Sequence, residues 1–190
     1  PGDDPGTIAS GPTVGDISTL AQAREILDTL AKDLNKRVIS ALADQLNESP
    51  SPSDARLANT ENHVIAAPMA SLQAAIKMAN ATGVEAILMG DDLQGEAREL
   101  GHKMAKRALE IRSGKSPVVL ISGGETTVTL TGKTEGKGGR NVEFLMGLAE
   151  GLNAAPNVFA LAGDTDGIDG AVEIAGAFVT PDTIQRAADL

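Results

Sequence analysis

The 190-residue sequence contains no cysteine, tryptophan or tyrosine, and only three phenylalanines and two histidines. Without cysteine, neither disulfide bonds nor thiolate metal sites can form. Single-strand nucleic-acid binders stack bases on aromatic side chains, so the scarcity of aromatics argues against that class. The formal net charge of −10 also disfavours nucleic acid and anionic membranes as partners. An anionic small-molecule ligand would therefore need a local cluster of cationic side chains.

Long hydrophobic runs are absent too, because no apolar stretch approaches the ~20 residues that a membrane-spanning helix needs. No signal peptide is recognisable, so we expect a cytoplasmic location. The sequence begins Pro-Gly-Asp-Asp-Pro without methionine and stops inside a predicted helix, which indicates a piece of a longer protein. The oligomeric state is left open, and a homodimer is one of the options.

The N-terminal third of the chain divides by composition. Residues 1–17 consist mainly of turn-forming residues, and hydrophobic residues at helical spacing then predict helices within 20–46. The polar stretch 49–60 contains two prolines and several serines and is the best candidate for a linker. We therefore expect residues 1–48 to be the end of one domain and residues 61–190 to form a second.

From residue 61 onward, short apolar runs alternate with amphipathic segments, which predicts an α/β fold with a parallel sheet and helices on its faces. The expected strands are 64–67, 86–89, 118–122, 126–131, 158–162 and 177–179. The expected helices are 69–81, 96–111, 141–152 and 183–190. Ligands of such sheets gather beyond the carboxyl ends of the strands, where Gly90–Asp92 and Ser122–Glu125 are expected.

Glycine is concentrated in one part of the sequence. Eleven of the 21 glycines fall between Gly123 and Gly170. Such clustering is typical of backbone that turns sharply or approaches a ligand closely. The alternative is a β-hairpin followed by a loop without a ligand. The candidate binding residues at the start of this region are Gly123, Gly124, Glu125 and Thr126.

The segment before the predicted helix 141–152 carries Lys137, Gly138, Gly139, Arg140 and Asn141. Glycine amides at a helix N-terminus attract anions, and Arg140 adds a forked, permanently charged donor. Phosphoryl transfer depends on such positioned cations, because orientation and charge stabilisation lower its barrier. We predict Lys137 and Arg140 as catalytic cations and the other three as binding residues. A purely structural ion pair between Glu125 and Arg140 is an alternative of similar weight.

Three aspartates follow the predicted strand 158–162, namely Asp164, Asp166 and Asp169. On a glycine-containing turn their carboxylates can hold Mg²⁺ directly or through water, so we predict them as metal ligands. The alternative is that they stabilise the turn and cap a helix. An EF-hand is excluded, because the glutamate required at its twelfth position would be residue 175, which is alanine.

Polar residues near the N-terminus form a further candidate group. Asp3 and Asp4 offer paired carboxylates suited to Mg²⁺ or to accepting a hydroxyl proton. Ser10, Gly11 and Thr13 place two hydroxyls beside flexible backbone. We predict Asp3 as a catalytic residue and Ser10, Gly11 and Thr13 as binding residues. The alternative is a disordered leader.

A set of motifs, in one order along the chain, resembles the class II glycerate kinase family. The motifs are Gly2–Asp4 with Ile8–Thr13, Gly95–Arg98, Gly123–Val128, Gly138–Asn141, Thr165–Gly170 and Ala175–Ala177. The last three match the family's C-terminal MOFRL domain. Because the set spans nearly the whole sequence in the family's order, it is far more specific than any one motif.

The resemblance implies phosphorylation of the 2-hydroxyl of D-glycerate by ATP and Mg²⁺, giving 2-phosphoglycerate. It implies two three-layer α/β/α domains with the active site in the cleft between them. The first would be Rossmann-like, with only its last part present, and the second a MOFRL-type domain with a mixed sheet. By the same resemblance, Arg140 contacts the transferred phosphoryl group or the substrate carboxylate. The residues lining the cleft would be Asp3, Ser10 and Thr13 from the first domain and Asp166 and Asp169 from the second.

Two parts of the family's sequence are absent from these residues: the N-terminal half with its essential lysine, and a C-terminal Gly-Pro-Thr-Gly-Thr-Asn segment. We therefore expect the chain alone to be inactive or nearly so. Some family members are named hydroxypyruvate reductases, so an NAD(P)H-dependent reductase is an alternative. Its G-x-G-x-x-G dinucleotide fingerprint does not occur in the sequence. A non-catalytic ligand-binding fragment is the second alternative.

Overall fold

The structure is a computed structural model that describes residues 4–6, 13–30, 35–111, 116–130, 132 and 137–189. The chain divides into two compact units, one comprising Gly2–Ala67 and the other Pro68–Leu190. The predicted linker 49–60 lies inside the first unit, and the domain boundaries expected from the sequence stay a prediction. In the part of the chain that the structure describes, no helix combines the length and hydrophobicity needed to cross a membrane.

The described part of the unit Gly2–Ala67 contains two short α-helices, α1 (Leu20–Leu30) and α2 (Lys36–Ala43). They are followed by the 3₁₀ helices η1 (Gln45–Asn47) and η2 (Ala55–Leu57). The Arg24 guanidinium donates to the Leu42 carbonyl at 2.8 Å and so joins α1 to α2. None of the described residues of these four helices is fully buried.

The strand predicted at 64–67 does not form, and this prediction is wrong. Val64 and Ile65 have the β-branched side chains that favour strands, yet they are 51 % and 96 % exposed. Strand preference measures how well a residue packs on a pleated surface with neighbours, and this segment pairs with no strand among the described residues. Propensity alone therefore did not decide its conformation.

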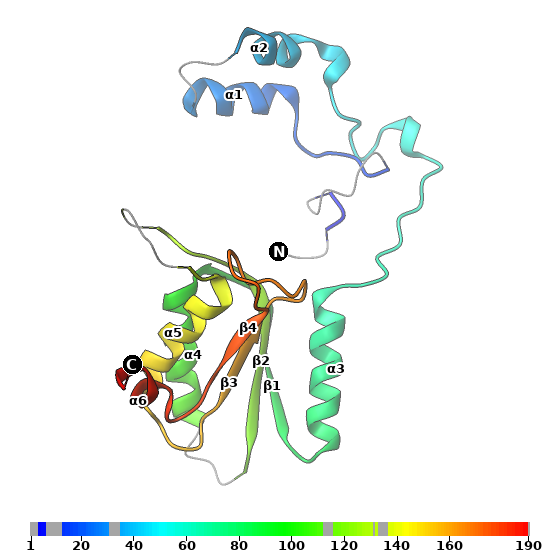
Figure 1. The fold of residues 1–190 in the computed structure, drawn as a ribbon. Coiled ribbons are helices and arrows are strands. Elements are labelled where there is room, and N and C mark those ends of the chain that lie inside the picture. The colour runs from blue at the N-terminus through cyan, green and yellow to red at the C-terminus, as the bar shows by residue number, and fades with distance from the viewer. Residues whose placement is uncertain are drawn as a thin grey trace. The chain divides into compact units, whose positions relative to one another are not determined.

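The unit Pro68–Leu190 begins with a helix–strand–helix–strand sequence, and Figure 1 shows its layers. The elements are α3 (Pro68–Ala81), β1 (Glu85–Glu96), α4 (Ala97–Ile111) and β2 (Val118–Thr127). β1 and β2 pair in parallel, as the alternation predicted. Helix α3 lies on one side of the strands, and α4 lies on the other side together with α5 (Arg140–Leu152). The α/β class is confirmed.

Both parallel strands run further than predicted. β1 continues past Met89 to Glu96 with register shifts near Gly90, and β2 continues past Ser122 to Thr127. Gly124 has φ +149°, and a Cβ there would overlap the Leu93 backbone. Only glycine fits this close approach of the two strands. Gly124 therefore allows the strand to continue and does not end it. Gly90–Asp92 and Ser122–Glu125 therefore lie within strands, and the prediction that they follow strand ends is wrong. The separate strand predicted at 126–131 is the end of β2, with 128–130 outside it.

Helices α4 and α5 pack backbone to backbone. A Cβ on Gly101 would overlap the Phe144 carbonyl oxygen, and one on Gly147 would overlap the Arg98 carbonyl oxygen. A Cβ on Gly151 would meet Ala105 at 2.7 Å. Small residues thus line both helices at their contact. The buried core next to this contact consists of Ala105, Leu145, Leu148, Ala149, Leu152, Ala155 and Val179.

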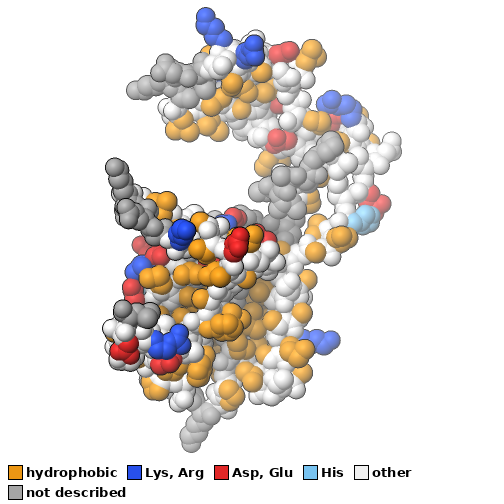
Figure 2. All heavy atoms as spheres, in the orientation of Figure 1, with side chains coloured by type: hydrophobic (Ala, Val, Ile, Leu, Met, Phe, Trp, Pro, Cys, Tyr) orange, Lys and Arg blue, Asp and Glu red, His pale blue; other side chains and the backbone are white. Residues whose placement is uncertain are grey.

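A hairpin completes this unit, formed by β3 (Ala160–Gly163) and β4 (Gly176–Val179), with α6 (Thr183–Ala188) after it. The strands pair antiparallel and turn Ala160, Ala162, Ala177 and Val179 toward the core. On the other face, Leu161 and Phe178 lie opposite each other and are 67 % and 73 % exposed. Figure 2 shows hydrophobic side chains gathered on the face of Pro68–Leu190 turned to the viewer. The parallel and antiparallel pairings expected of a mixed sheet both occur, as two separate strand pairs.

Candidate functional site

An ion pair joins two of the predicted segments. Arg140 is the first residue of α5, and its guanidinium Nη1 lies 2.9 Å from Oε1 of Glu125 on β2. Both side chains are largely open to solvent, at 47 % and 68 % exposure. The fold thus brings the glycine-rich stretch of β2 next to the basic segment before α5. The ion pair between Glu125 and Arg140, predicted from the sequence as an alternative, does form.

The N-terminus of α5 is capped from a distance by Asp169. The helix has Gly139 as its N-cap residue, which offers no side chain to accept a hydrogen bond. Instead, Asp169 Oδ1 accepts from the Asn141 amide at 2.9 Å and from Asn141 Nδ2 at 3.2 Å. Asp169 Oδ2 accepts from the Val142 amide at 2.9 Å. The anion at this helix end is therefore a carboxylate of the protein itself.

The backbones around Gly139 and Asp169 interlock. A Cβ on Gly139 would overlap the backbone and carboxyl carbon of Asp169, so the two segments can touch only because residue 139 is glycine. Gly170 has φ +68°, a conformation that glycine adopts without strain. The Ala171 amide donates to the Gly138 carbonyl at 3.3 Å. These glycines thus have a structural reason to be glycine that involves no ligand.

The segment between β3 and β4 holds the other two predicted metal ligands in a turn. The Asp164 carboxylate accepts from the Asp166 amide at 3.4 Å, and the Asp166 carboxylate accepts from the Ile168 amide at 2.9 Å. The Asp169 amide donates to the Ile174 carbonyl at 2.7 Å. Among the residues that the structure describes, no three histidine, aspartate or glutamate side chains are grouped so that they could hold a metal ion. The geometry of these aspartates is that of the turn-and-cap alternative.

The remaining predicted residues are distributed as follows. Lys137 and Gly138 are exposed and lie directly before Gly139. Gly123 lies in β2, where a Cβ would contact Leu72 of α3 at 3.4 Å, and Thr126 pairs with Gly95 of β1. Thr13 donates through Oγ1 to Asn62 Oδ1 at 2.9 Å within the unit Gly2–Ala67. The predictions for Asp3, Ser10 and Gly11 fall outside the described residues.

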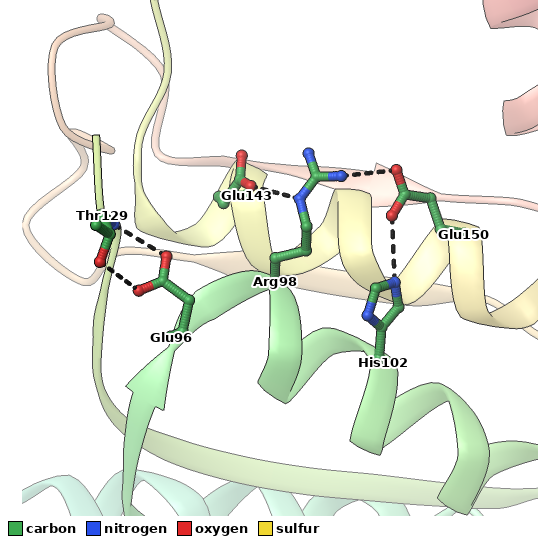
Figure 3. Close-up of polar contacts among 6 residues, drawn as sticks. All are labelled: Glu96, Arg98, His102, Thr129, Glu143 and Glu150. Atoms are coloured by element: carbon green, nitrogen blue, oxygen red, sulfur yellow. Dashed lines mark hydrogen bonds and ion pairs between the residues drawn. The ribbon is translucent and has the colours of Figure 1, made fainter. Parts of the chain in front are cut away.

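A polar network that the sequence analysis missed connects α4 to α5 (Figure 3). Arg98 contacts Glu143 at 2.7 Å and Glu150 at 2.8 Å, and His102 Nε2 lies 3.2 Å from Glu150. The hydrogen bond that Arg98 donates to Glu143 is the main cause that raises the pKa of Arg98 above its usual value. Arg98 and His102 are one helical turn apart, and Glu143 and Glu150 two turns apart. This helical spacing of basic residues on one segment and acidic residues on another was the feature of the sequence that could have predicted the network.

A second contact in Figure 3 fixes the chain after β2. The Glu96 carboxylate accepts from the Thr129 amide at 3.0 Å and from its hydroxyl at 2.9 Å. Glu96 ends β1, and Thr129 lies two residues beyond the end of β2. The carboxylate therefore holds the beginning of the segment that leads toward Lys137.

Comparison with known proteins adds to this geometry. Residues 68–190 form an α/β unit whose glycine-rich segments meet at the start of one helix. Residues 118–190 match the MOFRL family, and residues 1–47 match a domain of unknown function (DUF4147). The resemblance of the sequence to the class II glycerate kinases, the family with a MOFRL domain, is confirmed.

The relatives are longer than this chain. A protein of Agrobacterium vitis provisionally named hydroxypyruvate reductase is 47 % identical over 100 % of the chain and 43 % of its own length. A glycerate 2-kinase of Pyrococcus horikoshii is 33 % identical over 97 % of the chain and 43 % of its own length. A crystal structure of glycerate kinase from Thermotoga maritima has a TM-score of 0.75 at 30 % identity, covering 98 % of this chain and 44 % of that one. The chain thus spans less than half the length of these relatives.

Proposed function

We propose that this chain is part of a glycerate 2-kinase, which transfers the γ-phosphoryl group of ATP to the 2-hydroxyl of D-glycerate. Relatives that carry this name align along almost the whole chain. The observation that carries the proposal is the position of Arg140, an exposed guanidinium at the start of α5 beside the glycine-rich stretch of β2. Two expectations from the sequence stay predictions. They are the location of the active site in a cleft between two domains and the location of the protein in the cytoplasm.

The proposed reaction forms one bond and breaks one. The 2-hydroxyl oxygen of glycerate attacks the γ-phosphorus, the bond from that phosphorus to the bridging oxygen of ADP breaks, and the hydroxyl proton passes to a base. Asp3 is the proposed base, as expected from the sequence. Arg140 and Lys137 would stabilise negative charge on the transferred group, which is the main contribution that proteins make to phosphoryl transfer. Ser10, Gly11, Thr13 and the glycines near Arg140 would hold substrate and nucleotide.

The described residues could hold Mg²⁺ only together with the phosphates of a bound nucleotide. The described residues contain no cluster of three carboxylate or imidazole groups that could hold the ion alone. Mg²⁺ in kinases is commonly bound by one or two carboxylates together with nucleotide phosphates. Asp164 and Asp166 are the proposed carboxylates, since both lie in the turn after β3 and neither is fully buried. The ion would neutralise charge on the phosphates when bound.

The test is a coupled assay of the complete gene product that contains this sequence, with ATP, Mg²⁺ and D-glycerate. We expect Arg140→Ala to lower kcat by roughly 10²- to 10³-fold, the usual loss when a charge-stabilising donor is removed. Arg186→Ala, at an exposed arginine of α6, is the matched control and should leave kcat unchanged. An unchanged kcat in Arg140→Ala would remove Arg140 from the mechanism. Residues 1–190 alone should show almost no turnover, and a robust rate from them would refute that expectation.

The name of the Agrobacterium vitis relative favours a second candidate, an NAD(P)H-dependent hydroxypyruvate reductase. Its weakness is the absence of a G-x-G-x-x-G fingerprint from this sequence. Loss of NADH absorbance on addition of hydroxypyruvate to the complete gene product, without phosphorylation of glycerate, would establish the reductase instead. If neither activity is found, calorimetric titration with Mg·ATP distinguishes a ligand-binding module from a fragment that binds nothing.

A further inference from the structure

Asp169 is unusual among the charged residues of this chain. Its exposure is 1 %, and within the described residues it is the one polar or charged side chain that is fully buried. Removing a carboxylate from water is unfavourable unless hydrogen bonds compensate it. Here three donors do so, and all three belong to Asn141 and Val142 at the start of α5. The carboxylate is thus committed to one helix end.

That helix end could have been capped locally. A serine, threonine or aspartate at position 139 would ordinarily accept the hydrogen bonds of the first turn. The chain instead has glycine there, and a Cβ at this position would overlap Asp169. The consequence is that α5 is fixed at its start to the turn between β3 and β4, not only to itself.

Arg140 depends on this attachment because its other anchor is weak. Its guanidinium pairs with Glu125, but both side chains are largely exposed, and such pairs contribute only ~0–1 kcal/mol. Its backbone, by contrast, immediately precedes the two amides that the buried Asp169 carboxylate holds. Asp169 therefore holds the backbone immediately after Arg140.

We propose that Asp169 is a positioning residue for Arg140, a buried internal carboxylate that fixes the start of α5 so that the guanidinium points at the anionic group of the substrate. This assigns it a role different from metal binding, since both of its oxygens accept hydrogen bonds from α5. The kinetic part of this inference rests on the proposed kinase function, whereas the ordering of Arg140 does not.

The kinetic test compares Asp169→Asn with two controls in the complete gene product. Asparagine keeps the size of the side chain but turns an NH₂ group toward a donor. We expect kcat/KM for D-glycerate to fall roughly 10- to 100-fold, as for small misplacements of a reacting group, with an unchanged Mg²⁺ requirement. Asp182→Asn, at an exposed aspartate, should retain wild-type kinetics. Val179→Ala, which loosens the core beside α5, should lower the melting temperature without this kinetic loss.

A double-mutant cycle provides the decisive kinetic readout. If Asp169 acts through Arg140, then Arg140→Ala will cost much less in the Asp169→Asn background than in the wild type. Fully additive losses would overturn the proposal. So would a raised Mg²⁺ requirement in Asp169→Asn, which would make Asp169 a metal ligand. An equal loss in Val179→Ala at a matched melting temperature would overturn it too, because the effect would then be general destabilisation.

A measurement without activity keeps the two proposals separate. In the complete gene product labelled with ¹⁵N-arginine, relaxation of Arg140 Nε should report an ordered side chain in the wild type and Asp182→Asn, and a mobile one in Asp169→Asn. If the wild type phosphorylates no glycerate, the proposed function fails, and this measurement still decides the positioning role. An Arg140 side chain that is equally ordered in all three proteins would overturn it.

Discussion

Nη1 of Arg140, at the start of α5, lies 2.9 Å from Oε1 of Glu125 on β2, although the two residues are 15 positions apart in the sequence. Each partner comes from a segment that the sequence singled out for its glycines. The contact places a cation and an anion side by side where they are open to solvent. An anionic ligand of Arg140 would bind the remaining donors of the guanidinium or displace Glu125 from Nη1.

The first prediction concerns the strength of this pair. Glu125→Gln should change the free energy of unfolding of the chain by less than about 1 kcal/mol, because exposed ion pairs are weak and screened. Urea denaturation of the wild type, Glu125→Gln, Arg140→Gln and the double variant gives the coupling energy. A coupling well above that limit would show that the pair holds β2 to α5 and is not readily displaced.

The second prediction concerns the packing of α4 against α5. Alanine normally stabilises a helix relative to glycine by ~1 kcal/mol. Gly147→Ala should instead destabilise the chain by about 1–3 kcal/mol or more, because the new Cβ overlaps the Arg98 carbonyl oxygen. Gly138→Ala is the control, since a Cβ there meets nothing within 4 Å, and it should be close to neutral. Thermal unfolding of both variants measures the difference, and a stabilised Gly147→Ala would contradict the close helix contact.

The third prediction concerns the network around Arg98. Arg98→Gln removes the contacts to Glu143 and Glu150 and should lower the free energy of unfolding by about 1 kcal/mol, a modest value because the side chain is 39 % exposed. The loss should shrink as salt is added, since ions screen exposed charges. Arg107→Gln, whose partner Glu110 lies on the same helix, is the control and should have a smaller effect. Equal losses in the two variants would mean that the link between helices adds nothing.

The fourth prediction concerns pH and the unit Gly2–Ala67. Hydrogen bonds from the Arg56 side chain and amide lower the pKa of Asp54 to about 2. Because the folded-state value lies below the ordinary value of 3.8, the contact stabilises this segment fully above pH 3.8. Its contribution is lost as the pH falls toward about 2. A carboxyl NMR titration should show this midpoint in the wild type and a value near 3.8 in Arg56→Gln. The same midpoint in both proteins would rule out Arg56 as the cause.

The elements of Pro68–Leu190 were predictable because their apolar residues recur at helical spacing, and α4 and α5 each bury residues. Their ends were not. Gly90 and Gly124 are usual signs of a turn, but both lie inside strands at positive φ, and at Gly124 the close approach of the Leu93 backbone also requires glycine. The sequence around Gly124 contains the glycine, but it does not contain the adjacent strand whose backbone makes glycine necessary. The strand predicted at 64–67 failed for a related reason, because a strand needs a partner that composition does not specify.

The candidate site was predictable to a similar extent. Residues Glu125 and Arg140 could be selected from charge and glycine content, and their ion pair was one of two alternatives. The role of Asp169 could not be decided from its local sequence, since Asp164 and Asp166 stabilise their own turn while Asp169 caps a helix formed 28 residues earlier. Only the packing of the β3–β4 turn on α5 separates these three carboxylates.

That long-range cap has a consequence for the order in which the chain is made. The amides of Asn141 and Val142 leave the ribosome before the carboxylate that satisfies them, which follows 28 and 27 positions later. Until then the first turn of α5 lacks its acceptor and frays in water. We therefore expect the N-terminal turn of α5 to become stable only after the β3–β4 hairpin has formed and packed against it.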